Sequence, residues 1–381
     1  MKPAPSLADI AGKAGTAIST VSLALRNDPR VALPKRQHIQ LIAAEMGYQS
    51  NPLVSRLMFE LRKSRKQKYK ATLGVINVSA MSLASYNKIS NMAAWQQGLE
   101  QRAAQLGYNL DHFWLHDPEC QPHRVERILR ARNIQGVVFH GVMVENDLEP
   151  CKAITSRFPS VVMGVHLREP ALNFISNDHY FSAFHACRQL RKAGYRRIGI
   201  VLDQWLDDVL EHRYVAGYYA SHQRSEECLP VLYLSEPRAN VQPKQSFRLE
   251  GKAKFAEWIG QYRPDACICI NSYIVDWIRE LGIGIPNNMG FALLDLPREF
   301  NGVLAGMEPG STETGVKAID VLVGQIHRGE GGIPSFQTGT MIESKWMPGP
   351  TVRAELPPPS TPQPAPSRSP TGSSKRRVAA N

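Results

Sequence analysis

The sequence predicts two unlike parts, a small all-α head at the N-terminus and a large α/β body with parallel sheets behind it. Three observations indicate this division. The 381 residues exceed one typical domain by about two- to threefold. The positive charge is concentrated at the two ends of the chain. From residue 71 onward, short apolar runs alternate with amphipathic helical stretches, which is typical of βαβ units.

The composition is that of a folded chain. It is 43% hydrophobic and 21% charged, which excludes a mostly disordered or collagen-like protein. No apolar run approaches the roughly 18 residues of a membrane helix, and residues 1–9 lack the apolar centre of a secretion signal. We therefore expect a cytoplasmic protein that does not contact a membrane. The six cysteines are scattered, which predicts buried reduced thiols rather than a zinc site or a disulfide framework.

The charge is distributed unevenly along the chain. Residues 1–70 carry 13 lysines and arginines against 4 acidic residues, and residues 355–381 carry 4 against 1. The middle, residues 71–354, carries 28 basic against 29 acidic residues, so almost all of the net charge of +11 lies at the ends. A basic module on a neutral body suggests a head that binds a polyanion. The alternative is a solvated helical module with no such partner.

Three short helices are predicted in the first 46 residues. Ser6 followed by Asp9 three residues later is a helix-start signature, and Gly15 interrupts the helical pattern as a tight turn requires. A second helical segment covers Ile18–Leu25, and Pro34 opens a third. A helix, a short turn and a second helix form the geometry that places the second helix in the DNA major groove.

The second helix has an unusual outer face, which carries Ile18, Ser19, Ser22 and Leu23. Large apolar side chains on a small basic domain are unexpected unless something covers them. Thymine methyl groups can do so, while the serines donate to phosphates or base edges. The alternative is that Ile18 and Leu23 pack on the third helix or on the body.

Two stretches of the head resemble the lactose-repressor/galactose-repressor (LacI/GalR) family of transcriptional regulators. Residues 7–22 carry the LADIA, AG and STVS segments of its helix-turn-helix, and residues 48–57 (YQSNPLVSRL) resemble its hinge helix. With the body included, the resemblance covers residues 6–353. It implies a homodimer that binds a pseudo-palindromic operator in double-stranded DNA, most often as a repressor. The expected DNA contacts are Ile18, Ser19, Thr20, Ser22, Leu23 and Leu57.

The hinge segment begins with Asn51 and Pro52, a capping residue followed by proline at the first helical position. A helix there places Leu57 within an apolar stripe. In the resembled family the matching residue wedges into the minor groove and kinks the DNA, as apolar wedges do elsewhere. The alternative is an amphipathic helix that packs on the body. The basic run 62–68 follows directly and predicts a solvated linker or a strap along the phosphates.

The body is predicted to contain parallel sheets with helices on both faces. It resembles the two-lobed, periplasmic-binding-protein-like body of the same family, which implies a ligand cleft at the strand ends. The resemblance places lobe 1 at about 71–172 and 302–340, and lobe 2 at about 173–301 and 341–354. The whole chain then divides into a head (1–50), a hinge helix and basic linker (51–70), the body (71–354) and a disordered Pro/Ser-rich basic tail (355–381).

Six side chains at or just after apolar strands are candidates for this cleft. Five match ligand positions implied by the resemblance, and Trp205 can stack on a sugar ring, although a core or lobe-contact tryptophan is the alternative. An arginine among carboxylates and amides suits a hydroxyl-rich ligand or an anionic group on one. We expect a sugar or sugar derivative as the ligand. The six residues are His140, Trp205, Arg213, Asn271, Asp295 and Glu308. For each residue alone, a polar loop side chain facing water is the alternative.

The sequence departs from the resembled family at positions that set specificity. Ala17 stands where serine is usual, and Leu23 where many members carry arginine, so we expect a different operator. Gly164 and Val165 replace a common Asp-Arg pair, and the usual Asp-Asn pair at the end of a later strand reads Asp-His, ending at His179. The ligand pocket is therefore expected to differ from those of the well-known sugar repressors.

Catalytic and metal-binding patterns are missing from the sequence. The histidines at 112, 116 and 123 lack the spacing of metal ligands, and no phosphate loop, nucleophile elbow or glycine fingerprint occurs. We therefore expect no enzyme, no cofactor and no metal. The rival function is a stand-alone carbohydrate-binding protein whose head does not bind DNA. A steep salt dependence of DNA binding distinguishes the two. The tail lacks the leucine heptads of the tetramerising members of the resembled family, so the resemblance implies a dimer.

Overall fold

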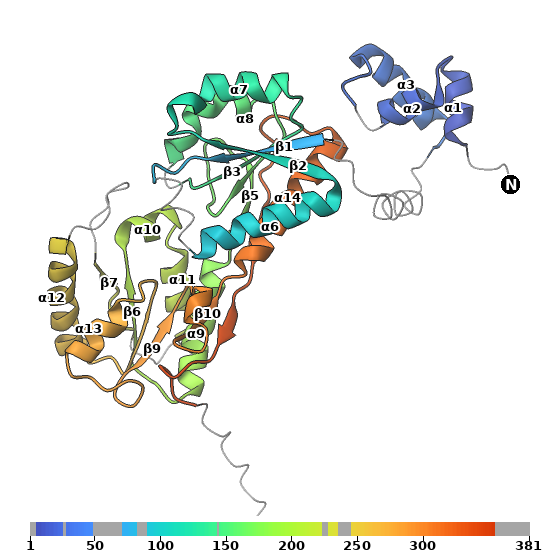
Figure 1. The fold of residues 1–381 in the computed structure, drawn as a ribbon. Helices are drawn as coiled ribbons and strands as arrows, with labels where there is room; N and C mark the ends of the chain where they lie inside the picture. The colour runs from blue at the N-terminus through green and yellow to red at the C-terminus, as the bar shows by residue number, and fades with distance from the viewer. Residues whose placement is uncertain are drawn as a thin grey trace, which may run out of the picture.

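The computed structural model describes residues 5–25, 28–48, 71–81, 90–142, 145–222, 228–234 and 245–354 (Figure 1). The predicted hinge helix with Leu57, the basic run 62–68 and the Pro/Ser-rich tail lie outside the described residues. Within the described part of the chain, no helix is both long enough and apolar enough to cross a bilayer.

The head contains the three predicted helices, α1 (Leu7–Lys13), α2 (Ile18–Leu25) and α3 (Leu33–Glu45). The predicted helix start is present as a complete capping box: the Asp9 amide donates to Ser6 Oγ, and the Ser6 amide donates to the Asp9 carboxylate. Gly15 adopts a left-handed backbone (φ +58°) in the turn before α2. The three helices enclose a core of their own, made by Ile10, Ala11, Val21, Ala24, Val31, Ile39, Ile42 and Ala43.

The body contains two six-stranded sheets, each the core of one lobe (Figure 1). The lobe 1 sheet has the order β11-β5-β4-β3-β1-β2, and all its neighbours are parallel. Its strands are β1 (Ala71–Asn77), β2 (Tyr108–Trp114), β3 (Val137–His140), β4 (Ser160–Met163), β5 (Asn173–Asn177) and β11 (Gly339–Ile342). The lobe 2 sheet has the order β12-β10-β9-β8-β6-β7, and only β12 is antiparallel. Its strands are β6 (Ile198–Leu202), β7 (Leu232–Tyr233), β8 (Ala266–Cys269), β9 (Gly290–Leu293), β10 (Ala305–Glu308) and β12 (Lys345–Met347).

Helices cover both faces of each sheet, because successive apolar residues of a buried strand point to opposite sides. On lobe 1, α6 (Ser90–Leu106) and α14 (Ser311–Arg328) cover one face, and α7 (Pro122–Ala131) and α8 (Lys152–Thr155) cover the other. On lobe 2, α9 (His179–Lys192) and α11 (Arg213–Ala220) lie opposite α12 (Gln245–Tyr262) and α13 (Ile274–Glu280). The short elements are α10 (Gln204–Val209) and the 3₁₀ turns Pro118–Cys120, Glu145–Cys151 and Arg298–Phe300.

The α6 and α14 helices approach so closely that only glycine fits at their contact (Figure 1). A Cβ atom on Gly98 would lie 2.0 Å from the carbonyl oxygen of Thr312, and one on Gly315 would lie 2.2 Å from that of Trp95. This close packing fixes α6, with Asn91 near its N-terminal end, against the sheet of lobe 1.

The chain passes between the lobes three times, after β5, after β10 and after β11. The predicted lobe boundaries are corrected at two strands. Residues 173–177 form β5 and pair with β4 and β11 in lobe 1, not lobe 2. Residues 305–308 form β10 and pair with β9 and β12 in lobe 2, not lobe 1. Both strands are short and largely buried, and a strand buried on two faces carries no local signal of the sheet it joins.

Candidate functional site

The outer face of α2 is the candidate DNA-binding surface of the head. Val21 and Ala24 point into the core, whereas Ile18, with 52% of its surface exposed, and Ser19 face solvent. Thr20 and Ser22 are half-buried. Leu23 packs partly against the head core, whereas Ile18 is not part of that packing. The structure therefore leaves Ile18 and Ser19 as the most accessible of the predicted contacts on α2.

Four of the six candidate ligand residues lie at the carboxyl ends of strands or two residues after them, and the other two lie on helices of lobe 2. His140 ends β3 and Glu308 ends β10, while Asn271 and Asp295 each follow a strand by two residues. Trp205 is half-buried on α10, and Arg213 is the first residue of α11. Because carboxyl ends of parallel strands meet at one edge of a sheet, this is where an open α/β sheet binds ligands.

Asn271 and Asp295 each form a hydrogen bond with a neighbouring side chain. The Asn271 amide donates to the Asp203 carboxylate over 2.9 Å within lobe 2. Asp295 joins the lobes, because it accepts a 2.7 Å hydrogen bond from Asn91 at the start of α6. Burial raises the pKa of Asp295 to about 6, although the Asn91 bond works in the opposite direction. Asn91, which the sequence analysis did not select, is thus a lobe-bridging residue.

His140 is a buried, neutral imidazole at the end of β3. Burial, and to a lesser extent the nearby His112, lower its pKa to about 4. A histidine of this kind stabilises the fold above its unfolded pKa of about 6.5, and this contribution is lost as the pH falls toward 4.

We expect the free energy of unfolding to depend less on pH below pH 7 in His140→Gln than in the wild type. Denaturant unfolding at pH 7 and pH 5 should show that the wild type loses about 2 kcal/mol more than the variant over this interval. His123→Gln is the matched control, because His123 is exposed on α7 and should leave the difference between the two pH values unchanged. An equal loss in the wild type and His140→Gln would contradict the buried, neutral state of His140.

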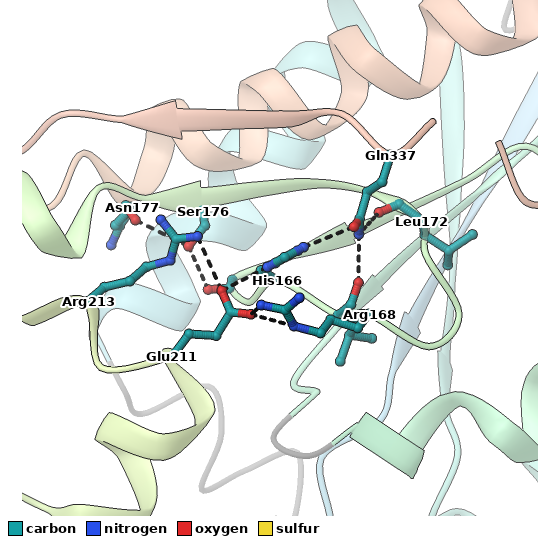
Figure 2. Close-up of polar contacts among 10 residues, drawn as sticks. His166, Arg168, Leu172, Ser176, Asn177, Glu211, Arg213 and Gln337 are labelled. Carbon is teal, nitrogen blue, oxygen red and sulfur yellow. Dashed lines mark hydrogen bonds and ion pairs between the residues drawn. The ribbon is translucent and has the colours of Figure 1, made fainter. Parts of the chain in front are cut away.

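Arg213 belongs to a polar cluster that connects the lobes (Figure 2). The Glu211 carboxylate, in the turn between α10 and α11 of lobe 2, lies at its centre. It accepts from Arg213 Nη2 at 3.2 Å, and from His166 Nδ1 and Arg168 Nε at 2.9 Å each. His166 and Arg168 lie on the connection from β4 to β5 of lobe 1. Burial raises the pKa of Glu211, but these hydrogen bonds outweigh it and lower the pKa to about 2.

His179 is a second buried polar group beside Arg213. Its ring packs edge-on against Tyr214, with ring centroids 4.9 Å apart. Burial, and secondarily Arg213, lower its pKa to about 3. Within the described residues its Nδ1 atom is buried and has no hydrogen-bond partner. His179, Arg213 and Glu211 line one cavity of about 10 Å³, which is about the space of a single water molecule.

No sequence pattern marks His166, Arg168 and Glu211, because these residues lie in loops without periodicity. Glu211 and His212 are both left-handed (φ 53° and 56°), a conformation that non-glycine residues rarely adopt and that no sequence signal marks. The departure from the family noted at Gly164 was the nearest available signal, since His166 follows it by two residues. The described residues contain no group of three or more His, Cys, Asp or Glu side chains able to hold a metal ion.

Comparison with known families and structures bears on both parts of the chain. Residues 6–51 match the family model for bacterial regulatory proteins of the lacI family. The lac repressor dimer bound to operator and the anti-inducer ONPF is similar, with 15% identity and a TM-score of 0.55 over 92% of this chain and 100% of that one. The transcriptional regulator CelR in complex with cellobiose is also similar, with 14% identity and a TM-score of 0.55 over 91% of this chain and 99% of that one. The transcription regulator CcpA of Lactococcus lactis has 14% identity and a TM-score of 0.54 over 74% of this chain and 100% of that one. A search of curated proteins gives no match.

A three-helix head of this pattern, joined to a two-lobed α/β body with parallel sheets, is the architecture of solved transcriptional regulators such as the lac repressor. The head belongs to the lacI family of bacterial regulatory proteins, and the body has the fold of solved regulators of that family.

Proposed function

We propose that this chain is a sequence-specific DNA-binding repressor, acting in the cytoplasm as a homodimer, whose operator affinity is controlled by a sugar or sugar derivative in the cleft. The observation that carries the proposal is the pair of polar bridges between the lobes, Asp295 with Asn91 and Glu211 with His166 and Arg168, behind a head of the lacI family. The named complexes of similar proteins, with operator or with cellobiose, support both partners.

The proposed mechanism couples the cleft to the heads. A ligand that contacts both lobes favours the closed arrangement, and the lobes set the separation of the two hinge segments in the dimer. Operator affinity then changes only by the difference in ligand affinity between the two arrangements. The ligand contacts we propose are His140, Trp205, Arg213, Asn271, Asp295 and Glu308.

The proposed DNA contacts divide into two sets. Ile18, Ser19, Thr20, Ser22 and Leu23 of α2 read the major groove, with two heads on the two halves of a pseudo-palindrome. Leu57 of the hinge segment enters the minor groove between them. Basic side chains of the head and linker neutralise phosphates and supply most of the affinity.

A salt titration of DNA binding separates this proposal from a stand-alone carbohydrate-binding protein. If each head neutralises three phosphates, the six contacts should lower the affinity for duplex DNA by about a thousandfold between 50 and 200 mM salt. Fluorescence anisotropy of a labelled duplex measures this slope. Weak binding that does not change with salt would favour the carbohydrate-binding alternative.

Leu57→Ala tests the wedge. Removing the apolar side chain should reduce DNA bending and weaken operator binding by about tenfold or more. Ligand binding should stay at the wild-type level, because the proposed ligand contacts all belong to the body and Leu57 belongs to the hinge segment. Gel phasing measures the bend, and calorimetry measures ligand binding. Leu53→Ala, in the same predicted helix, is the control for a general loss of helix packing. An unchanged bend in Leu57→Ala would exclude the wedge.

A further inference from the structure

The cluster around Glu211 has the chemistry of an occupied anion site. Three donor side chains converge on one carboxylate: His166 Nδ1, Arg168 through Nε at 2.9 Å and Nη2 at 2.7 Å, and Arg213 Nη2. Two nitrogens of one guanidinium on one carboxylate are typical of the recognition of carboxylate and phosphate groups. The acceptor here is a side chain of the protein itself.

His166 lies between two hydrogen-bond acceptors. Its Nε2 atom lies 2.9 Å from Gln337 Oε1 (Figure 2). The Gln337 amide nitrogen already donates to the carbonyl oxygens of Leu167 and Leu172, which fixes the amide oxygen as an acceptor toward His166. The Glu211 carboxylate at Nδ1 is an acceptor as well. Two arginines and one histidine therefore face a single carboxylate.

The backbone at Glu211 is strained. It and His212 are consecutive left-handed residues without being glycine, and the His212 ring is held by a 2.9 Å contact with the buried Asp207. Strain of this kind persists only where surrounding contacts hold it. An acceptor that replaces the Glu211 carboxylate would let the turn relax.

The cavity at the cluster is so small that a ligand group can bind there only by replacing the Glu211 carboxylate. The cavity lined by Glu211, Arg213 and His179 holds about 10 Å³, too little for any organic group while Glu211 occupies it. Once Glu211 leaves, the unpartnered Nδ1 of His179 and the released Arg213 face the vacated position. The site thus has an unused buried polar atom for a ligand as well as the cations.

We propose that the effector carries an anionic group, a carboxylate or a phosphate, and that this group binds His166, Arg168 and Arg213 by displacing Glu211. The proposal deepens, and rests on, the proposed function as a ligand-controlled regulator. Glu211 bridges the lobes when the ligand is absent, and the acidic ligand takes over this bridge when it binds. The ligand class is therefore a sugar acid or a sugar phosphate rather than a neutral sugar.

The test compares neutral and acidic members of matched sugar pairs on the full-length protein. Isothermal titration with D-glucose, D-glucuronate and D-glucose 6-phosphate, and with D-galactose and D-galacturonate, is carried out on the wild type and on Glu211→Gln. At least one acidic probe should bind Glu211→Gln ten times more tightly than the wild type, because glutamine competes weakly for the cations. The uronates and the phosphate distinguish the two sources of negative charge. Glu330→Gln, which alters an exposed ion pair with Arg328, is the control.

Arg168→Gln keeps the test decisive if Glu211→Gln does not fold. Arg168 is 68% exposed, so its replacement should leave the fold intact and weaken binding of the acidic probe by about tenfold without affecting neutral sugars. Tighter binding of neutral than acidic members, or no gain for any acidic probe in Glu211→Gln, would overturn the proposal. If neutral sugars then release DNA, the proposed function stands without this inference. If the protein binds neither DNA nor any sugar, both fail.

Discussion

Arg213→Ala is expected to weaken ligand binding by at least about a hundredfold and to leave operator binding intact. Arg213 lies at the start of α11, pairs with Glu211 and faces His179. Truncating one partner of a partly buried, charge-assisted pair costs about 2–5 kcal/mol, because the charge of the remaining partner is left unpaired and without its hydrogen bonds. The head has a separate core and contains none of these residues, so DNA binding should not change.

The measurement is a pair of titrations on the same protein. Calorimetry follows the ligand found by screening the wild type, and anisotropy follows operator binding with and without that ligand. Arg188→Ala is the matched control, because Arg188 is an exposed arginine of the same lobe that lies over the Phe184 ring. A normal ligand response in Arg213→Ala would mean that the pocket lies elsewhere.

Val21→Asn is expected to abolish DNA binding while the body keeps its stability and its ligand affinity. Val21 is fully buried at the centre of a core formed by only three short helices. A small domain has little stability to spare, and an unpaired buried amide costs about 1–3 kcal/mol in addition to the lost apolar contacts. The head should therefore unfold, and specific DNA affinity should fall by more than about a hundredfold.

The control is the same substitution at an exposed leucine of the head. Leu41 on α3 is 64% exposed, so Leu41→Asn should preserve the head. Circular dichroism and calorimetry of both variants separate head unfolding from body unfolding, and anisotropy reports DNA affinity. Retention of DNA binding by Val21→Asn would contradict the assignment of DNA binding to the head.

Local patterns in the sequence were sufficient to predict the head. The Ser6 and Asp9 capping box, the Gly15 turn and the apolar spacing act within a few residues of one another. The strand ends carrying His140 and Asp295 were equally visible, because an apolar run followed by a polar residue marks the carboxyl end of a buried strand.

The bridges between the lobes could not be predicted in the same way. His166 bonds to Glu211 across 45 residues, and Asn91 bonds to Asp295 across 204 residues. Such contacts depend on which sheet each strand joins, and the sequence misassigned β5 and β10 for this reason. Glu211 depends in addition on a strained backbone that the sequence does not encode in any short motif.

The most direct test of the central claim is selection of bound sequences from a random duplex library by the purified full-length protein at moderate salt. The selection is run without ligand and again with a mixture of neutral and acidic sugars, so that a need for a corepressor is covered. A pseudo-palindrome whose centre is a flexible step, recovered in at least one arm, is the expected result. Recovery of no sequence above background in either arm would contradict the assignment of this protein as a DNA-binding regulator.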